Sequence, residues 1–202
     1  MVAVLVAALP VVARGQAGGA EGRCAQPHYR WSQKIDTSLA GRAPIPTSVG
    51  VVLSTWEPPR VTRNDRCALR AGREGQVYVL MGWVRRIERA KDDGDWHIEV
   101  TERQQSPPDS CLVAEIPPAA LHRLYAAARS DLARLIGGSR VKARGTLDPP
   151  VRVRLTGAAF FDGQHRLVSR RGEDRGIQGH GRCNASLRAL WEIHPAYRVE
   201  PP

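Results

Sequence analysis

The sequence predicts a mainly β protein, namely a small OB-like β-barrel with one helix between its third and fourth strands and an irregular N-terminal extension. Three β-branched, apolar stretches come first, one stretch with helical spacing follows, and two or three further strand-like stretches close the chain. That order is typical of an OB-fold, although an unrelated small β-barrel would give the same order. We expect a signal peptide at 1–20, the extension at 21–75 and the barrel domain at 76–202.

The first three strands are expected after residue 75. Residues 76–89 (QVYVLMGWVRRIER) combine β-branched and aromatic side chains with a central glycine, which favours a strongly bent strand. Residues 91–100 (KDDGDWHIEV) supply a turn and then a strand on which alternate apolar residues share one face: Trp96, Ile98 and Val100. Residues 111–117 (CLVAEIP) indicate a short, mostly apolar third strand.

The helix is expected between Pro118, which is tolerated in a first turn, and the Gly137-Gly138 pair that ends it. Its apolar residues recur at helical spacing: Leu121, Leu124, Ala128, Leu132 and Leu135. The later strands are expected at 140–147, 151–161 and 189–199. Residues 162–188 are polar and rich in Gly and Arg, which predicts a long loop or flap. Within the extension, residues 48–56 (SVGVVLSTW) suggest one more strand.

The N-terminus indicates export. Residues 2–13 form an apolar run that is too short for a bilayer, which needs about 20 apolar residues. The run matches the core of a secretory signal, with residues 15–20 as the cleavage region, although the usual basic segment before it is missing. We therefore expect a periplasmic or extracellular protein without a transmembrane segment in the mature chain.

Four cysteines in an exported chain predict two disulfides, and none of the spacings is that of a CxxC metal or redox pair. Three pairings are open from the sequence. We expect Cys24–Cys67, which would tie the extension to itself, and Cys111–Cys183, which would tie the third strand to the loop before the last.

The net charge of +10 comes almost entirely from arginine and favours anionic partners, although a GC-rich genome produces the same bias. Five basic residues are expected on the outward face of two neighbouring strands: Arg140, Lys142, Arg144, Arg152 and Arg154. OB-folds that bind nucleic acid combine such a face with stacking aromatic residues. Aromatic residues make up only 5% of this chain, which weighs against that alternative.

Three stretches, DGDWH, FFDGQH and WEIHP, each place a histidine near a carboxylate. Because side chains alternate along a strand, the Asp/His pair of the first stretch and the Glu/His pair of the last should each share a face. We expect one polar cluster from these stretches: Asp95, His97, Asp162, His165, Glu192 and His194. A structural hydrogen-bond network, a ligand-binding patch and a metal or catalytic site are the three interpretations.

The ordered trio of DGDWH, FFDGQH and WEIHP resembles a group of uncharacterised bacterial exported proteins with an OB-like barrel. The resemblance covers residues 78–197 and implies fold, compartment and the grouping of Asp95 and His97 with His165, Glu192 and His194. It implies no activity.

The function expected from the sequence is an exported binding module that needs no cofactor. One alternative is a metal-dependent hydrolase, such as a nuclease, that uses the polar cluster with a divalent metal such as zinc. The other is a nucleic-acid-binding protein that uses the arginine-rich face. No Gly-rich phosphate loop, HExxH helix or GxSxG elbow is present in the sequence.

Overall fold

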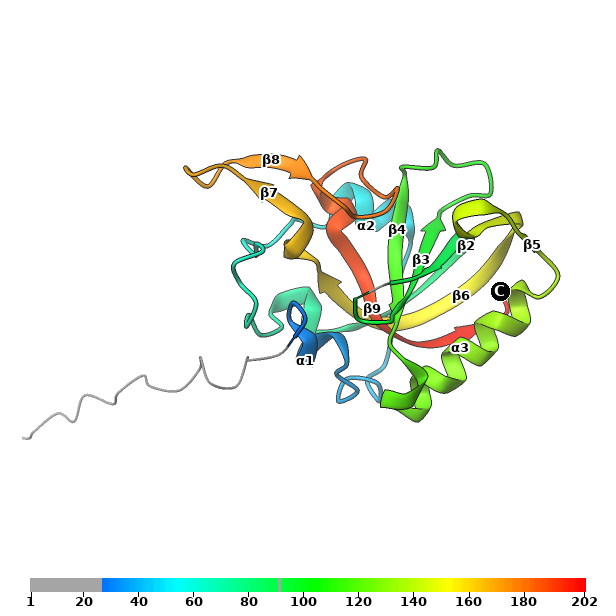
Figure 1. Cartoon of the computed structure of the whole chain (residues 1–202). Coiled ribbons are helices and arrows are strands. Elements are labelled where there is room, and N and C mark those ends of the chain that lie inside the picture. Colours follow the sequence, from blue (N-terminus) through cyan, green and yellow to red (C-terminus); the bar gives the residue numbers. More distant parts are fainter. Residues whose placement is uncertain (1–26, 91) are drawn as a thin grey trace, which may run out of the picture.

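The chain is mainly β, and seven of its strands form one large sheet (Figure 1). The structure is a computed structural model that describes residues 27–90 and 92–202. The strands are β1 (Ile45–Thr47), β2 (Val77–Arg89), β3 (Trp96–Thr101), β4 (Cys111–Ile116), β5 (Arg140–Val141), β6 (Thr146–Phe161), β7 (Arg166–Val168), β8 (Asp174–Ile177) and β9 (Trp191–Glu200). The helices are α1 (Trp31–Lys34), α2 (Val49–Thr55) and α3 (Arg123–Ile136).

The strand pairings of the large sheet run in a ring. Strands β2, β3 and β4 form an antiparallel meander. Strand β9 then pairs parallel with β4, and β6 pairs antiparallel with β9. Strand β6 also pairs antiparallel with β2, where the ring began. Short strands β1 and β5 extend the sheet beside β2 and β6.

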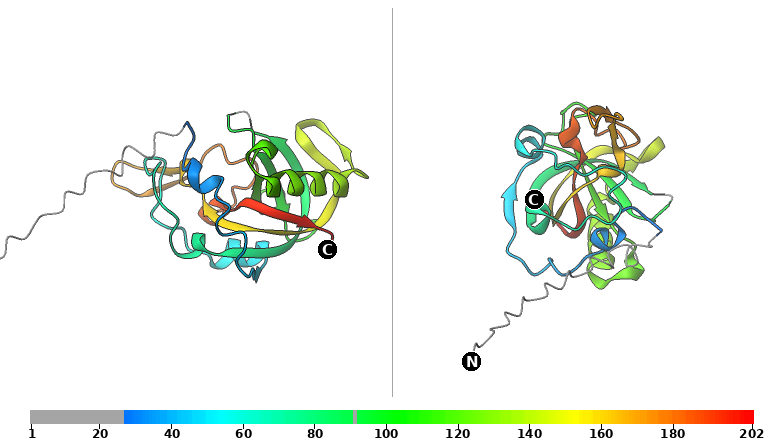
Figure 2. Two further views of the ribbon diagram at one scale, coloured as in Figure 1. Left: turned by 90° about the horizontal axis from the view of Figure 1, so that it is seen from below. Right: turned by 90° about the vertical axis from the view of Figure 1, so that its left-hand side faces the viewer.

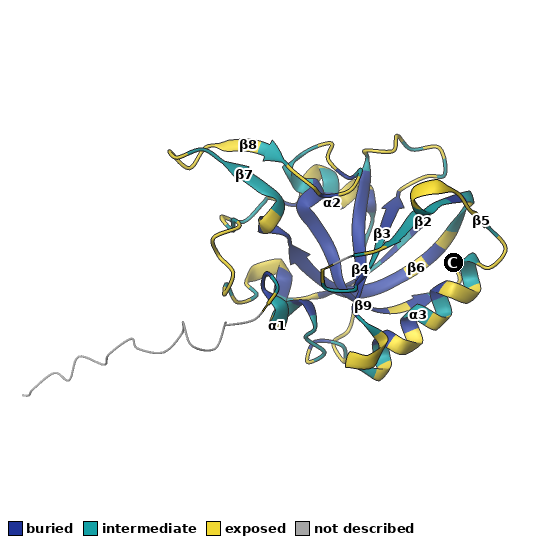
Figure 3. Ribbon diagram, in the orientation of Figure 1, coloured by how far each residue is buried: buried dark blue, intermediate teal, exposed yellow. Residues whose placement is uncertain are grey.

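The apolar core lies on the inward face of this sheet, and β4 is wholly and β9 almost wholly buried (Figure 3). Ile98 and Val100 of β3 share that face, as the alternation predicts, and so do Trp191 and Ile193 of β9. Period-two alternation therefore turns the polar residues between them, among them His97 and Glu192, to the outer face of the same strands.

Helix α3 packs against β9 (Figure 2) and follows β4 in the chain. It begins at Arg123 rather than at Pro118, because residues 119–121 form a separate 3-10 turn and His122 caps the helix. The Leu124 N–H donates to the His122 ring at 3.2 Å. In the part of the chain that the structure describes, no helix is long and apolar enough to cross a membrane.

The prediction of a strand at 48–56 is wrong, since this segment forms helix α2 and its two caps. The Ser48 hydroxyl accepts a hydrogen bond from the Val51 N–H and caps the helix. Val49, Val52 and Trp56 recur at the i, i+3, i+7 spacing of one helical face, and all three are buried in the core. Short apolar runs of this kind fit either element, and the serine cap favours the helix here.

Two further segments differ from the expectation. The strand expected at 140–147 is reduced to two residues of β5, because the chain turns back through Arg144, which has a positive φ of 58°. The long loop expected at 162–188 contains the β7–β8 hairpin, which extends away from the large sheet in Figure 1.

Part of the outer face of the sheet is covered by a second layer of chain. The Cys111–Cys183 disulfide joins the start of β4 to the loop before β9, as predicted. Both cysteines lie with Val113 and Ala189 in a small apolar cluster on the outer side of the sheet. Cys67 is also disulfide-bonded. Its predicted partner, Cys24, and the expected signal peptide lie outside the described residues.

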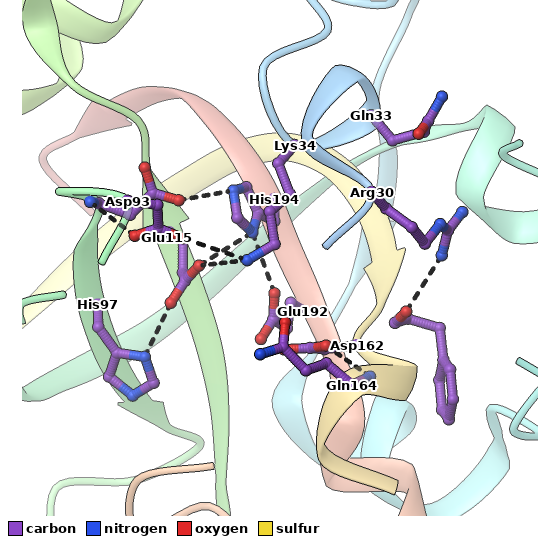
Figure 4. A network of polar contacts seen from close by, with 12 residues as sticks. Arg30, Gln33, Lys34, Asp93, His97, Glu115, Asp162, Gln164, Glu192 and His194 are labelled. Carbon is purple, nitrogen blue, oxygen red and sulfur yellow. Dashed lines mark hydrogen bonds and ion pairs between the residues drawn. The ribbon is translucent and has the colours of Figure 1, made fainter. Parts of the chain in front are cut away.

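The N-terminal extension supplies the rest of that layer. The Arg30 guanidinium is buried, forms two hydrogen bonds with Glu74 at 2.8 and 3.0 Å, and lies 4.7 Å from the centre of the Phe160 ring. Lys34, at the end of α1, points toward the outer face of β4 and β9 (Figure 4). The outward polar residues of these strands are therefore enclosed rather than solvated.

Candidate functional site

A polar cluster of eight residues lies on the outer face of β3, β4 and β9 and at the ends of neighbouring segments. Figure 4 shows His97, Glu115, Asp162, Glu192 and His194 of this cluster. Strands β3 and β4 place His97 directly opposite Glu115. Strand β9, which runs beside β4, carries a glutamate and a histidine on the same face. The members are Asp95, His97, Glu115, Asp162, His165, His180, Glu192 and His194.

His194 is the centre of one half of the polar cluster and is fully buried. Its Nδ1 atom donates to Glu192 at 3.1 Å and lies 3.0 Å from Oε2 of Glu115. Its Nε2 atom lies 3.1 Å from Oδ2 of Asp95. Burial alone would lower the pKa of His194, but the surrounding carboxylates raise it well above its usual value. These contacts favour the protonated form of His194, and each ring nitrogen lies within ion-pair distance of a carboxylate.

Lys34 adds a second buried cation to the same half. Its Nζ atom lies 3.4 Å from Asp93 and 3.9 Å from Oε2 of Glu115. Burial opposes the charge of the ammonium, but the carboxylates, with Glu115 first, raise its pKa above the usual value. Burial would likewise raise the pKa of Glu115, which His194, His97 and Lys34 together hold well below its usual range. Two cationic side chains therefore lie in this half, although burial still raises the pKa of Asp95 above its usual value.

His180 is the centre of the other half. Its Nδ1 atom lies 3.1 Å from the carbonyl oxygen of Cys183, and its Nε2 atom lies 2.9 Å from Oε1 of Glu192. A carbonyl only accepts, so Nδ1 carries a proton. Burial lowers the pKa of His180, but the bond to Glu192 and its charge outweigh this and raise the pKa to about 9. Burial and the charge of Glu115 act to raise the pKa of Glu192, but His180 and His194 lower it to about 2.

Asp162 and His165 complete this half. Donor atoms of Asp162, His180 and Glu192 lie within 4.8 Å of one another, and all three residues are buried. Nε2 of His165 lies 3.4 Å from Oδ2 of Asp162, and its Nδ1 donates to the carbonyl of Gln178 at 2.7 Å. Burial first, and then the charge of Glu192, raise the pKa of Asp162. The positive charges of Lys34, His165 and His180 oppose this rise but do not outweigh it.

His97 lies between the two halves. Its Nδ1 atom donates to Oε1 of Glu115 at 2.9 Å, and its ring centre is 6.3 Å from that of His180. Its Nε2 atom is buried without a hydrogen-bond partner. Burial would lower the pKa of His97, but Glu115 raises it above the usual value.

A cavity of about 200 Å³ opens among these side chains. Its wall includes Lys34, Asp93, His97, Glu115, Asp162, Gln164, His165, His180 and Glu192. His194 and Asp95 do not line it. The cavity wall therefore contains the whole His180 half together with Lys34, Asp93 and Glu115 of the other half. Three histidines of the wall each have Nδ1 held by an acceptor: a carboxylate for His97 and backbone carbonyls for His165 and His180.

The structure brings all six residues expected from the sequence into this polar cluster. The partners differ from the expectation within the first stretch: Asp95 contacts His194, and His97 contacts Glu115 rather than its neighbour Asp95. The reason is that β3 begins at Trp96, so that Asp95 lies before the strand. Sequence reasoning missed Glu115, His180 and Lys34.

The basic face expected on two neighbouring strands forms only in part. Arg140 and Lys142 contact Asp148, and Arg154 contacts Glu200. Arg144 lies in the turn after β5 and not on a strand. The exposed Arg152 of β6 remains on the outward side as expected. Three of the five basic residues thus contact acidic neighbours, and two of them share the single carboxylate of Asp148.

Comparison with known proteins gives no match: no protein family, no curated protein and no solved structure is recognisably similar to this chain.

Proposed function

We propose that this protein is an exported, OB-like β-barrel binding module that holds one divalent transition-metal ion, best matched by zinc, in the cavity of the polar cluster. The ligands would be Nε2 of His180 and carboxylate oxygens of Asp162 and Glu192, with Nε2 of His165 as the fourth donor. The observation that carries the proposal is the convergence of donor atoms from three buried residues, Asp162, His180 and Glu192, within 4.8 Å of one another. The Nδ1 atom of His180 is held by the carbonyl oxygen of Cys183, which leaves Nε2 to face the two carboxylates.

The fixed Nδ1 atoms favour metal ligation over a purely structural network. Histidines that bind metals almost always donate the other ring N–H to a carbonyl or carboxylate, which sets the tautomer and aims the free nitrogen. His180 and His165 have this arrangement, with carbonyl acceptors on Cys183 and Gln178. A mixed nitrogen and oxygen donor set of four atoms suits zinc better than magnesium or calcium, which prefer oxygen alone.

The distribution of charge between the two halves also favours a metal ion in the His180 half. His194 lies within ion-pair distance of Asp95 and Glu115, and Lys34 lies 3.9 Å from Glu115, so that this half already contains two cationic side chains. In the other half, the proton between His180 and Glu192 is the charge that a metal ion would replace, since ligation requires neutral imidazole. The buried carboxyl group of Asp162 would then gain a cation as its neighbour. We accordingly place one ion, in the His180 half.

The ring of strand pairings and the position of α3 between β4 and β6 in the chain support the OB-like barrel. The Cys111–Cys183 disulfide supports export, because disulfides persist mainly in oxidising compartments. A cavity of about 200 Å³ accepts an ion and a few waters but no polymer, which favours binding over the hydrolase alternative.

Zinc titration of the full-length, tag-free protein after removal of metal with a chelator tests the proposal. We expect one zinc ion per chain with micromolar or tighter affinity. His180→Gln and Asp162→Asn should each weaken binding at least about tenfold, because each removes one donor from the set. Asparagine can still accept the hydrogen bond from the Gln164 N–H, so that the turn is preserved.

His28→Gln is the matched control, because His28 stacks on Trp31 and lies outside the polar cluster. It should leave zinc binding unchanged. Absence of saturable zinc binding by the wild type would refute the proposal, as would equal affinity of the wild type and His180→Gln.

A further inference from the structure

A second concave site lies on the far side of the loop that carries His180. This arginine groove has a volume of about 490 Å³ and is lined by Arg86, Ala143, Arg144, Thr146, Gly179, Gly181 and Arg182. Gly179 also lines the cavity of the polar cluster, so that one short loop separates the two sites. The arginine groove contains none of the proposed metal ligands.

The three arginines have different roles. All donor groups of the Arg86 guanidinium are engaged: Nε with the Arg144 carbonyl at 2.7 Å, Nη1 with Glu99 at 2.7 Å and Nη2 with Glu88. Arg182 contacts the same Glu99 through Nε at 2.6 Å, and its backbone N–H donates to Glu99 at 3.0 Å. Among the residues that the structure describes, its two terminal nitrogens have no partner and remain for a ligand. Glu99 is 1% exposed and acts as the buried anchor of both arginines.

Arg144 is the free cation of the arginine groove. Among the described residues its guanidinium has no hydrogen-bond or ion-pair partner, whereas its backbone carbonyl is held by Arg86. Its backbone is left-handed, with φ 58° and ψ 32°, a conformation that costs free energy in a residue other than glycine. Such outliers collect at binding sites, because the surrounding structure must over-determine them. Arg86 and the adjoining Gly145, whose φ is 72°, supply that constraint here.

We propose that the arginine groove binds the phosphate group of a nucleotide, with Arg144 and Arg182 as its ligands and Arg86 as the residue that positions Arg144. Planar guanidinium groups with unused N–H donors match phosphate oxygens bidentately. A groove of about 490 Å³ is much larger than a free phosphate ion needs and has the size of a site for a small organic ligand. The hydroxyl of Thr146 in its wall adds a further polar group.

The arginine groove differs from the arginine-rich strand face that the sequence suggests. Only Arg144 is common to both, and the other two arginines of the groove come from β2 and from the loop before β9. The nucleotide can be free or part of a single strand, because both carry the same phosphate chemistry. The proposal does not depend on the metal ion, since no residue is shared between the two ligand sets.

The test measures binding of adenosine monophosphate, inorganic phosphate and a short single-stranded DNA to the full-length protein at low salt, with and without chelator. We expect saturable binding of the mononucleotide or the DNA, weakened at least about tenfold by Arg144→Gln and by Arg182→Gln. Arg154→Gln is the matched control, because Arg154 lies on β6, contacts Glu200 and is outside the groove. It should bind like the wild type.

The ligands distinguish the two sources of phosphate. Binding of adenosine monophosphate that inorganic phosphate competes away identifies a free nucleotide, whereas binding of DNA alone, with affinity that falls as salt rises, identifies a strand. Absence of binding of both, or equal binding by the wild type and Arg144→Gln, would overturn the proposal. Chelator should change none of these results, so that failure of the metal site and failure of the groove are separate outcomes.

Discussion

The Nε2 atom of His180 lies 2.9 Å from Oε1 of Glu192, although one residue belongs to a loop and the other to strand β9. Both side chains are almost wholly buried, at 1% and 2% exposure. The contact places a proton at the position of the proposed metal ion. It also couples the loop that forms the arginine groove to the strand that carries His194.

The Cys111–Cys183 disulfide should hold His180 in its position within the polar cluster. Cys183 accepts the hydrogen bond from His180 with its carbonyl and is bonded to Cys111 through its sulfur. The double variant Cys111→Ser/Cys183→Ser should lower the free energy of unfolding by about 4 kcal/mol, since the bond closes a loop of 72 residues. It should also weaken zinc binding. Denaturant unfolding and zinc titration measure the two effects, and zinc affinity equal to that of the wild type would contradict the role assigned to the loop.

Gly181 should be intolerant of any side chain. Its φ is 59°, and an added Cβ would lie 2.8 Å from Nε2 of His97 and 2.9 Å from Oε1 of Glu99. Gly172 has a similar φ of 80° but nothing within 4 Å, and so it isolates the backbone effect. Gly172→Ala should cost about 1 kcal/mol. Gly181→Ala should cost clearly more, because one contact belongs to the polar cluster and the other to the arginine groove. Equal costs in denaturant unfolding would show that the loop is not packed as described.

Lys34 should be essential for stability, because it compensates buried carboxylates. Lys34→Met keeps the apolar stem and removes the ammonium near Asp93 and Glu115, which should cost about 3 kcal/mol. Lys142→Met is the matched control, since its partner Asp148 is solvent-exposed and the pair is screened. The control should change the free energy of unfolding little. A Lys34→Met variant as stable as the wild type would argue against a charged Lys34 in the polar cluster.

Glu99 should make stability depend on pH in the acid range. Burial alone would raise its pKa, but the bonds from Arg86 and Arg182 outweigh this and lower the pKa below the usual value. A carboxyl with a lowered pKa in the folded state stabilises the protein above its unfolded pKa. That stability is lost as pH falls through the folded pKa. The free energy of unfolding of the wild type should therefore fall below about pH 4.5. Glu99→Gln should show a smaller fall, and identical slopes for the two proteins would count against the Arg86–Glu99–Arg182 network.

The sequence predicts the order of strands and the outward direction of the polar pairs, because both depend on local alternation. Ile98 and Trp191 turn inward, and their neighbours His97 and Glu192 therefore turn outward. The same alternation in CLVAEIP places Glu115 on the face of Val113. The mostly apolar composition of this stretch hides that pattern in the sequence. His180 offers no such signal. It lies in an irregular loop whose position depends on the distant Cys111 and on Glu192.

The burial of the polar cluster is also not predictable from the sequence. Lys34 and Arg30 belong to an extension whose composition suggests irregular structure, and their positions depend on long-range contacts with Glu115, Glu74 and Phe160. Helix α2 was missed for a different reason: Val49, Val52 and Trp56 fit a strand as well as a helix in so short a run. Local alternation along the strands therefore sets the outward direction of these polar side chains, whereas contacts with distant segments of the chain bury them.

The metal ion is most directly tested by anomalous diffraction at the zinc absorption edge, on crystals of the zinc-saturated full-length protein. The account predicts one strong peak in the cavity, with Nε2 of His180 about 2.0–2.1 Å away and oxygens of Asp162 and Glu192 about 2.0–2.2 Å away. It also predicts that His194 keeps its contacts with Asp95 and Glu115. An empty cavity in zinc-saturated crystals, with His180 still hydrogen-bonded to Glu192, would contradict the central claim and identify the polar cluster as a structural network.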